Sequence, residues 1–168
     1  MQMKKKTYLI TLLVLILDQA TKWFASVRLD GHEVIEIIPG YLRFAFMRNS
    51  GVAFGLFTEI QSVWKPIILA LLAVAAIVVI LVYSARVPMN RILLQIALAM
   101  TLGGILGNLT DRVTHGSVAD FIEFHIHESF YWPMFNIADS AITIGIAMLL
   151  IDALRNPEAE EAQKSPGF

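Results

Sequence analysis

Ionisable and amide side chains occur inside or beside long apolar segments of this 168-residue chain, where they are costly to carry. A charged group at the centre of a bilayer costs at least about 2.5–3.5 kcal/mol, so such residues are interpreted first as functional. They gather near one end of their segments, which places them at one face of a membrane. The set comprises Asp18, Lys22, Asn108, Asp111, Arg112, Asp120, Asn136 and Asp139.

Each of these residues also has a structural interpretation. Asp18 and Lys22 are four positions apart and can form a helical ion pair. Asn136, followed three residues later by Asp139, can cap the N-terminus of a helix. Asp120 can be an ordinary loop carboxylate. Their convergence on one membrane face is what favours a functional site.

Paired carboxylates in such a place could hydrolyse an amide bond. Two carboxylates near a low-dielectric edge do not easily ionise together, so one keeps its proton while the other acts as a base. The base activates water, and the protonated partner hydrogen-bonds the scissile carbonyl. Asparagine or arginine donors nearby would stabilise the developing oxyanion. The residue types therefore favour an aspartic peptidase.

The sequence offers few of the residues that other hydrolytic mechanisms require. The chain has no cysteine, which excludes a thiolate nucleophile. His127-Glu128 lacks the second histidine of a zincin helix, and Ser140 is not in a Gly-x-Ser-x-Gly context. Glu123, His125 and His127 could ligate a metal, but an exposed polar edge explains their alternation with apolar residues better. We expect neither a metal nor a cofactor.

The composition places the chain in a membrane. Hydrophobic residues make up 57% and charged residues only 16%, which is too little polar surface for a soluble domain. The apolar residues form four runs near the length of about 20 residues that a spanning helix needs. The first run, preceded by lysines, resembles a signal peptide, but three more runs follow and we interpret it as an uncleaved span. The predicted spans are 8–25, 66–83, 92–109 and 137–154.

The positions of the positive charges predict the orientation. Cytoplasmic flanks of spans are enriched in lysine and arginine, which here places both termini in the cytoplasm. The loop after the first span also carries positive charges, but the lysine cluster lies directly against the first helix. The net charge of −1 gives no basic field for nucleic acid. The residues that favour this orientation are Lys4, Lys5, Lys6, Arg86, Arg91 and Arg155. The residues that oppose it are Arg28, Arg43, Arg48 and Lys65.

The predicted fold is an all-α polytopic membrane protein with two extracytoplasmic segments, 26–65 and 110–135. In the first segment, a β-branched run, Pro39-Gly40 and an aromatic run predict a small β-hairpin or sheet. The second is expected to be a short loop segment that is extended or interfacial. Gly103 and Gly107 predict tight helix packing. Residues 1–156 form one domain, and 157–168 form an acidic, disordered cytoplasmic tail.

Five short segments of the chain together resemble the lipoprotein signal peptidase family, also called signal peptidase II. The resemblance covers nearly the whole chain, and five segments in the family's order are far more specific than any one of them. Val52 and Ala119 stand where the family pattern leads us to expect alanine and valine, and both keep the apolar character. The segments are DQATK at 18–22, NSGVAF at 49–54, GGILGNLTDR at 103–112, DFI at 120–122 and FNIADS at 135–140.

The resemblance implies an intramembrane aspartic endopeptidase with Asp120 and Asp139 as its catalytic pair. Its implied substrates are prolipoproteins whose cysteine already carries a diacylglyceryl group, cut just before that cysteine. It also implies a bacterial inner membrane location, contact with membrane lipids, and a monomer. The residues implied to line or support the site are Asn49, Gly51, Asn108, Arg112, Asn136, Asp18, Lys22 and Asp111.

Two other functions remain as alternatives. A small proton-coupled transporter could use Asp18, Asp120 and Asp139 as a relay, although such a path needs ionisable groups at several depths. A scaffold could use the polar residues only to join helices. Neither alternative explains why the polar residues concentrate at one face.

Overall fold

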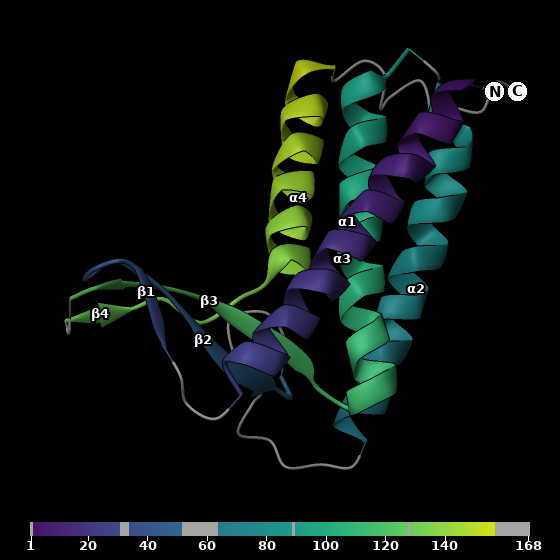
Figure 1. Cartoon of the computed structure of the whole chain (residues 1–168). Helices are drawn as coiled ribbons and strands as arrows, with labels where there is room; N and C mark the ends of the chain where they lie inside the picture. The colour runs from purple at the N-terminus through teal and green to yellow at the C-terminus, as the bar shows by residue number, and fades with distance from the viewer. Residues whose placement is uncertain (1, 31–33, 52–63, 89, 128, 157–168) are drawn as a thin grey trace, which may run out of the picture.

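The computed structural model describes residues 2–30, 34–51, 64–88, 90–127 and 129–156. In these residues, four helices and four strands follow one another (Figure 1). Residues 52–54 of the second family-like segment and the predicted tail at 157–168 lie outside the described residues. The helices are α1 (Gln2–Arg28), α2 (Lys65–Arg86), α3 (Ile92–His115) and α4 (Ile137–Arg155).

Four helices are long and apolar enough to cross a membrane, which confirms the prediction of four spans. The main difference concerns α3, which was expected to end near residue 109 and instead continues to His115. Gly116 then ends it in the left-handed conformation with φ of 72°, which glycine adopts without steric cost. The six additional residues put Asp111 and Arg112 on the helix rather than in the following loop.

Helix α3 is the centre of the bundle. Twelve of its 24 residues are buried, whereas α2, every residue of which is described, buries none. A Cβ on Gly103 would lie 2.8 Å from Cβ of Val14 in α1, and one on Gly104 would lie 2.4 Å from the carbonyl oxygen of Ala138. The prediction of tight helix packing is therefore confirmed, because only glycine lets α1 and α4 approach α3 this closely.

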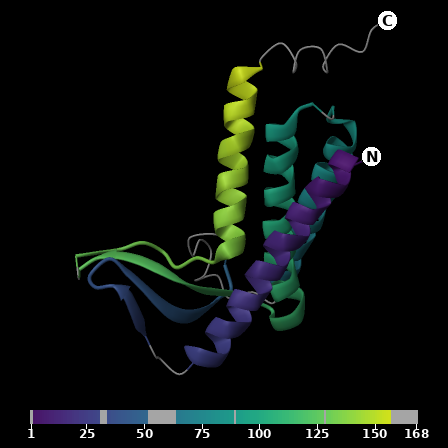
Figure 2. The same ribbon diagram turned by 45° about the horizontal axis from the view of Figure 1, so that its top comes forward.

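An antiparallel sheet of order β1-β2-β3-β4 lies at one end of the bundle (Figures 1 and 2). The predicted hairpin is confirmed, and Gly40 turns it with a φ of 79°. The second outer segment, 110–135, was expected to be a short loop segment that is extended or interfacial. Its extended character is confirmed, but part of it is a nine-residue strand that pairs with β2 rather than a loop. The strands are β1 (Ile35–Ile38), β2 (Leu42–Asn49), β3 (Val118–Ile126) and β4 (Phe130–Tyr131).

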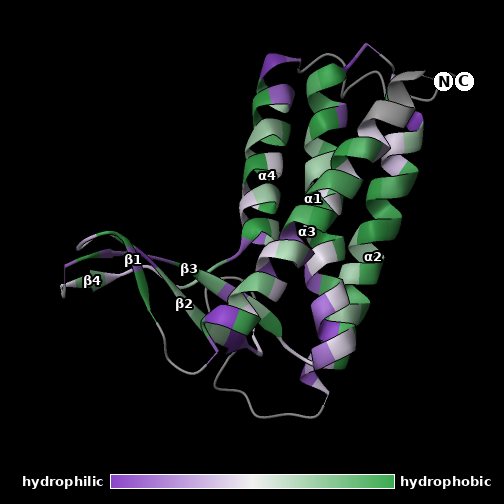
Figure 3. Cartoon of the chain, in the orientation of Figure 1, coloured by the Kyte–Doolittle hydropathy of each residue, from purple (hydrophilic) through white to green (hydrophobic). Residues whose placement is uncertain are grey.

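The sheet is joined to the bundle by an apolar cluster and by polar helix ends. Ala25, Leu29 and Phe121 are buried together, which holds the end of α1 against β3. The start of α1 and the end of α4 lie at the opposite end of the bundle. Hydrophobic residues dominate the middle of the helices, and hydrophilic residues collect on α1 and α3 where they meet the sheet (Figure 3).

Candidate active site

The structure brings all ten predicted site residues together where the sheet meets the bundle. They come from five elements and the turn after β2, and hydrogen bonds or ion pairs connect each of them to at least one other member. Because these elements are far apart in sequence, the cluster depends on the whole fold. Its members are Asp18, Lys22, Asn49, Gly51, Asn108, Asp111, Arg112, Asp120, Asn136 and Asp139.

Asn136 and Asp139 form a capping box at the start of α4. The side-chain oxygen of Asn136 accepts from the backbone N–H of Asp139 at 2.9 Å, and Oδ2 of Asp139 accepts from the backbone N–H of Asn136 at 3.3 Å. The predicted helix cap is confirmed. The same bonds hold the Asp139 carboxylate in one place, so the cap also builds the site.

Asp120 is 1% exposed and lies within β3, not in the loop that was expected. Its Oδ2 accepts from Nδ2 of Asn49 at 2.9 Å, and its Oδ1 accepts from Nδ2 of Asn136 at 2.6 Å. Burial, reinforced by the negative charge of Asp139, raises the pKa of Asp120 to about 6 despite these donors. The carboxyl can therefore take up or release a proton near neutral pH.

Asn136 and Asn108 connect the two carboxyl groups to the rest of the site. Asn136 uses its side chain on Asp120 and its backbone N–H on Asp139. Asn108 donates from Nδ2 to Oδ1 of Asp139 at 2.8 Å. Each carboxyl group therefore accepts amide hydrogen bonds, which stabilise its ionised form. The low-dielectric surroundings destabilise the same form.

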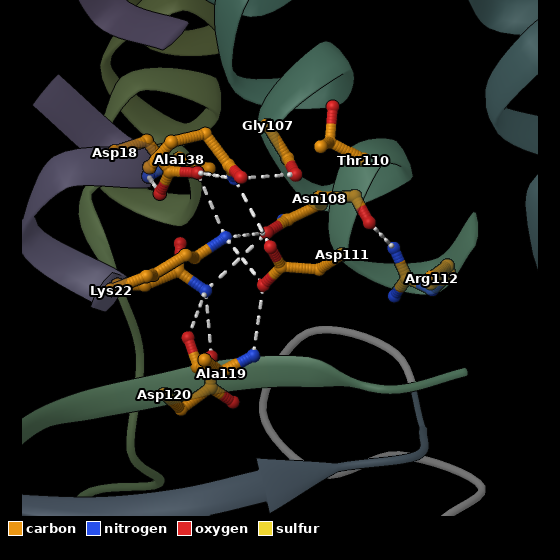
Figure 4. Close-up of polar contacts among 12 residues, drawn as sticks. Asp18, Lys22, Gly107, Asn108, Thr110, Asp111, Arg112, Ala119, Asp120 and Ala138 are labelled. Carbon is orange, nitrogen blue, oxygen red and sulfur yellow. Dashed lines mark hydrogen bonds and ion pairs between the residues drawn. The ribbon is translucent and has the colours of Figure 1, made fainter. Parts of the chain in front are cut away.

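Lys22 is buried among acceptors between Asp18 and Asp120 (Figure 4). Its Nζ lies 2.9 Å from Oδ2 of Asp18 and 3.1 Å from Oδ2 of Asp111. The predicted i,i+4 ion pair with Asp18 is confirmed. The second carboxylate, 89 positions further along the chain, makes the pair a three-charge cluster. Lys22 also donates to Oδ1 of Asn108 at 2.9 Å, which links this cluster to the carboxyl pair.

The two carboxylates of the lysine cluster also fix neighbouring backbone. Oδ1 of Asp18 accepts from the N–H of Ala138 at 2.9 Å, which ties α1 to the start of α4. Oδ2 of Asp111 accepts from the N–H of Ala119 at 3.0 Å, which ties α3 to β3. These bonds position the residues next to Asp139 and Asp120, respectively.

Arg112 approaches the pair from the last turns of α3. Its guanidinium donates to the carbonyl oxygen of Gly51 at 3.1 Å and to that of Asn108 at 3.3 Å. The charges of Asp139 and Asp120 act on it electrostatically. Arg112 therefore provides a positive charge beside two carboxyl groups that repel each other.

Gln19 belongs to this site but was treated only as part of a short segment in the sequence. Its Nε2 donates to Oδ1 of Asp111 at 3.0 Å and to Oδ2 of Asp18 at 3.2 Å. It also donates to the carbonyl oxygen of Gly107 at 3.2 Å. The signal that could have identified it is a polar residue beside Asp18 inside an apolar span.

A cavity of about 550 Å³ lies between the sheet and α4 and reaches Asp139. Its walls are largely aromatic and aliphatic, with Ser140 and Thr143 beside Asp139 on α4. An apolar ligand in this cavity would lie next to one of the two carboxyl groups. The apolar lining includes Phe124, Phe130, Trp132, Phe135 and Ile144.

The alternative metal-binding residues are engaged elsewhere on the sheet. Glu123 forms an ion pair with Arg43. His125 stacks on Tyr131, with ring centroids 5.6 Å apart, and its Nδ1 lies 3.0 Å from the carbonyl oxygen of His127. Within the described part of the chain, no three potential ligands among His, Cys, Asp and Glu form a group suited to a metal ion.

The described residues contain four candidate membrane spans and two carboxyl groups that accept hydrogen bonds from side-chain amides, buried Asp120 and half-buried Asp139. These features define the class of this protein: a polytopic membrane protein with a carboxylate site at one end of its bundle. Comparison with known proteins then identifies the family. Residues 10–155 match the family described as signal peptidase (SPase) II, and the chain belongs to it. It is therefore a membrane peptidase.

Individual relatives agree with the family. The chain is 40% identical to the lipoprotein signal peptidase of Pseudomonas fluorescens (strain Pf0-1) over 91% of this chain and 89% of the relative. It is also 40% identical to that of Pseudomonas aeruginosa (strain UCBPP-PA14) over 91% of this chain and 90% of the relative. The expected resemblance to lipoprotein signal peptidases is confirmed.

Two solved structures share the fold. One, described as a bacterial membrane enzyme solved by the in meso method at 2.3 Å resolution, has a TM-score of 0.81 and 28% identity, covering 98% of this chain and 94% of its own. Another, solved by the same method at 1.9 Å, has a TM-score of 0.79 and 31% identity, covering 90% and 94%. The arrangement of four helices and a small sheet is therefore shared with membrane enzymes.

Proposed function

We propose that this protein is an intramembrane aspartic endopeptidase that removes signal peptides from diacylglyceryl-modified prolipoproteins. Asp120 and Asp139 are its catalytic residues. The observation that carries the proposal is that Asn136 hydrogen-bonds both carboxyl groups, one of which, Asp139, lines an apolar cavity. A linked pair of this kind can share one proton, as two-carboxylate hydrolysis requires.

The reaction needs one ionised and one protonated carboxyl group. The ionised member takes a proton from a water molecule, whose oxygen attacks the scissile carbonyl carbon. The protonated member hydrogen-bonds the carbonyl oxygen as its negative charge develops. The pair then returns a proton to the leaving nitrogen, and the C–N bond breaks. The pKa of about 6 at Asp120 supports this proposal, because both charge states are accessible near neutral pH.

Neighbouring donors would hold the substrate and stabilise charge. Arg112 carries a fixed positive charge beside the pair, and it donates to the carbonyl oxygen of Gly51, two residues after Asn49. We assign Arg112 to the stabilisation of the developing oxyanion. Asn49 and Asn136 hold Asp120, and Asn108 holds Asp139.

The substrate assignment rests on the relatives, which are lipoprotein signal peptidases, and on the apolar cavity. A substrate that carries acyl chains meets the enzyme at the membrane surface, where the polar ends of α1 and α3 adjoin the sheet. The cysteine that bears the diacylglyceryl group would thus be held at the depth of the carboxyl groups. The bond that breaks is the one just before this cysteine.

We place the protein in the bacterial inner membrane with both termini in the cytoplasm and the sheet outside. Arg86, Arg91 and Arg155 lie at the helix ends remote from the sheet, as the positive-inside rule requires of a cytoplasmic face. The ten site residues come from one chain, which supports activity as a monomer in contact with membrane lipids. No cofactor and no nucleic acid are needed.

The hydrogen bonds within the spans do not support the alternative function, a transporter with a proton relay. Ionisable pairs occur at the two ends of the bundle, with Lys22 in one cluster and Arg91–Asp152 in the other. Between these ends, Thr11 and Thr101 donate to helix carbonyl oxygens in the part of the chain that the structure describes. No observation therefore favours the transporter.

The test is the mass of a lipidated preprotein before and after incubation with the purified protein in detergent. We expect loss of the leader up to the lipidated cysteine, with the cysteine as the new N-terminal residue. The same preprotein without the diacylglyceryl group should react much more slowly. Cleavage elsewhere, or equal rates on both substrates, would contradict the proposal and would indicate a general membrane protease.

A further inference from the structure

We propose that Lys22 is a positioning residue for the reaction, because it sets the orientation of the Asn108 amide that holds Asp139. Nζ of Lys22 donates to Oδ1 of Asn108 at 2.9 Å, and Nδ2 of the same amide donates to Oδ1 of Asp139 at 2.8 Å. Lys22 thus acts through Asn108 on the carboxyl group of Asp139, with which it forms no direct hydrogen bond. This inference rests on the proposed function.

The chemistry of the ammonium group makes the orientation obligatory. A lysine ammonium has three N–H donors and no acceptor. Two of the donors face Asp18 and Asp111, and the third faces Asn108. Turning the amide over would place its NH2 group against the ammonium and its oxygen against the carboxyl group of Asp139. Both new contacts would be repulsive while Asp139 is ionised.

The orientation decides which oxygen of Asp139 can carry a proton. Oδ1 accepts the amide N–H of Asn108 at 2.8 Å, so it remains an acceptor. Within the described part of the chain, Oδ2 accepts a longer bond, from the backbone N–H of Asn136 at 3.3 Å. The proton that the pair shares is therefore directed to Oδ2 when it resides on Asp139. Losing the orientation would let either oxygen take it, and the fraction of molecules ready to react would fall.

Asn108 differs from the other two amides of the site in what orients it. The side-chain oxygen of Asn49 accepts from the backbone N–H of Gly51 at 2.8 Å. That of Asn136 accepts from the backbone N–H of Asp139 at 2.9 Å. These two amides are oriented by backbone donors rather than by a side chain. The side-chain oxygen of Asn108 instead accepts from two side chains, from Nζ of Lys22 at 2.9 Å and more weakly from Nδ2 of Asn136 at 3.4 Å.

The test is a double-mutant cycle of Lys22→Met and Asn108→Leu, assayed for cleavage of the lipidated preprotein and for Tm in detergent. Met keeps the length of the buried side chain, and Leu keeps the shape of asparagine without its polar ends. We expect each single variant to lower kcat about 100-fold, as misplacement of a reacting group does, with KM little changed. The double variant should also lose about 100-fold, because Lys22 acts through Asn108. Losses that multiply to about 10⁴-fold would overturn the proposal.

A direct electrostatic or purely structural role of Lys22 would give a different pattern. Loss of its charge would then affect kcat equally with and without Asn108. Tm should fall with Lys22→Met in both backgrounds, because Asp18 and Asp111 lose their counter-ion. Asp18→Asn is the matched comparison, since it weakens the same cluster but leaves the Lys22–Asn108 bond. Asp18→Asn should lower Tm but should lower kcat much less than Lys22→Met does. A loss of kcat equal to that of Lys22→Met would contradict the positioning role.

If Lys22→Met does not fold, Asn108→Asp provides a second test of the bond between Asn108 and Asp139. The new carboxylate still accepts from Lys22, so the cluster is retained, but it cannot donate to Asp139. We expect a kcat loss at least as large as that of Asn108→Leu, and an acid limb of the pH profile shifted to higher pH by the added negative charge. Near wild-type kcat would overturn the proposal. If the wild type itself cleaves no lipidated preprotein, the proposed function fails first and this inference fails with it.

Discussion

Asn136 donates its side-chain amide to Oδ1 of Asp120 at 2.6 Å while its backbone N–H donates to Oδ2 of Asp139. One residue therefore contacts both carboxyl groups, one through its side chain and one through its backbone. Since Asn136 also caps α4, the helix start and the geometry of the pair are built by the same atoms. Stability and activity can be separated here only by substitutions that keep the cap.

Asp120→Asn and Asp139→Asn should each lower kcat at least about 10³-fold, because asparagine keeps the shape of aspartate but cannot exchange a proton. Both variants should insert and fold, which Tm in detergent will verify. Asp30→Asn, at an exposed position on the chain after α1, is the matched control and should behave as wild type. Near wild-type turnover by either site variant would disprove the assignment of the pair.

Asn136→Ser and Asn136→Ala should differ in stability but not in activity. Serine can still cap the N–H of Asp139, whereas alanine cannot, so alanine should be less stable by about 1 kcal/mol. Neither can donate an amide N–H to Asp120. A hydrogen bond to a charged group is worth about 1.5–3 kcal/mol, so we expect both to lower kcat about 10- to 100-fold.

Denaturation midpoints and initial rates on the lipidated preprotein measure the two effects separately. An Asn136→Ser variant with wild-type kcat would show that the contact with Asp120 is structural only.

The local parts of the site could be predicted from the sequence. Asp18 and Lys22 are one helical turn apart, and Asn136 and Asp139 fit a helix N-terminus, so each pair follows from helix geometry alone. The four spans follow from the apolar runs in the same way.

The long-range parts could not be predicted from patterns. The pairing of Met47 with Asp120 brings β2 against β3 across more than 70 positions, and no local signal gives that register. The contact of Lys22 with Asn108 likewise exists only because α1 packs closely on the glycines of α3. The Arg91–Asp152 ion pair joins the start of α3 to the end of α4 and was missed for the same reason.

The raised pKa of Asp120 predicts how stability depends on pH. A carboxyl group with a pKa of 3.8 in the unfolded chain and about 6 in the folded protein binds protons more strongly when folded. The free energy of unfolding should therefore fall as pH rises from about 4, through the folded pKa, to about 7, and stay level above that. At about 1.36 kcal/mol per pKa unit, the full effect is about 3 kcal/mol.

Asp120→Asn removes this titration. The Tm of the variant relative to wild type should rise steadily between pH 4 and pH 7, whatever the offset at pH 4. A difference between Asp120→Asn and wild type that is constant across this range would contradict the raised pKa.

The cavity beside Asp139 provides the last prediction. Thr143 lies one helical turn after Asp139 on α4 and lines this cavity, so Thr143→Trp would fill part of its volume of about 550 Å³. If the cavity receives an apolar part of the substrate, we expect KM for the lipidated preprotein to rise at least about 10-fold, which corresponds to a loss of about 1.4 kcal/mol of binding. The carboxyl pair is not altered, so kcat at saturating substrate should fall much less.

Leu150→Trp is the matched control, because it introduces the same side chain on the same helix at a position that is 62% exposed and does not line the cavity. Both variants should insert and show similar Tm values, and only Thr143→Trp should raise KM. The measurement is the initial rate of leader release over a range of substrate concentrations in mixed micelles, with the ratio of lipid to detergent held constant. An unchanged KM in Thr143→Trp would mean that the substrate approaches Asp139 from another side. A similar rise in both variants would mean that the bulky side chain acts through the membrane rather than through the cavity.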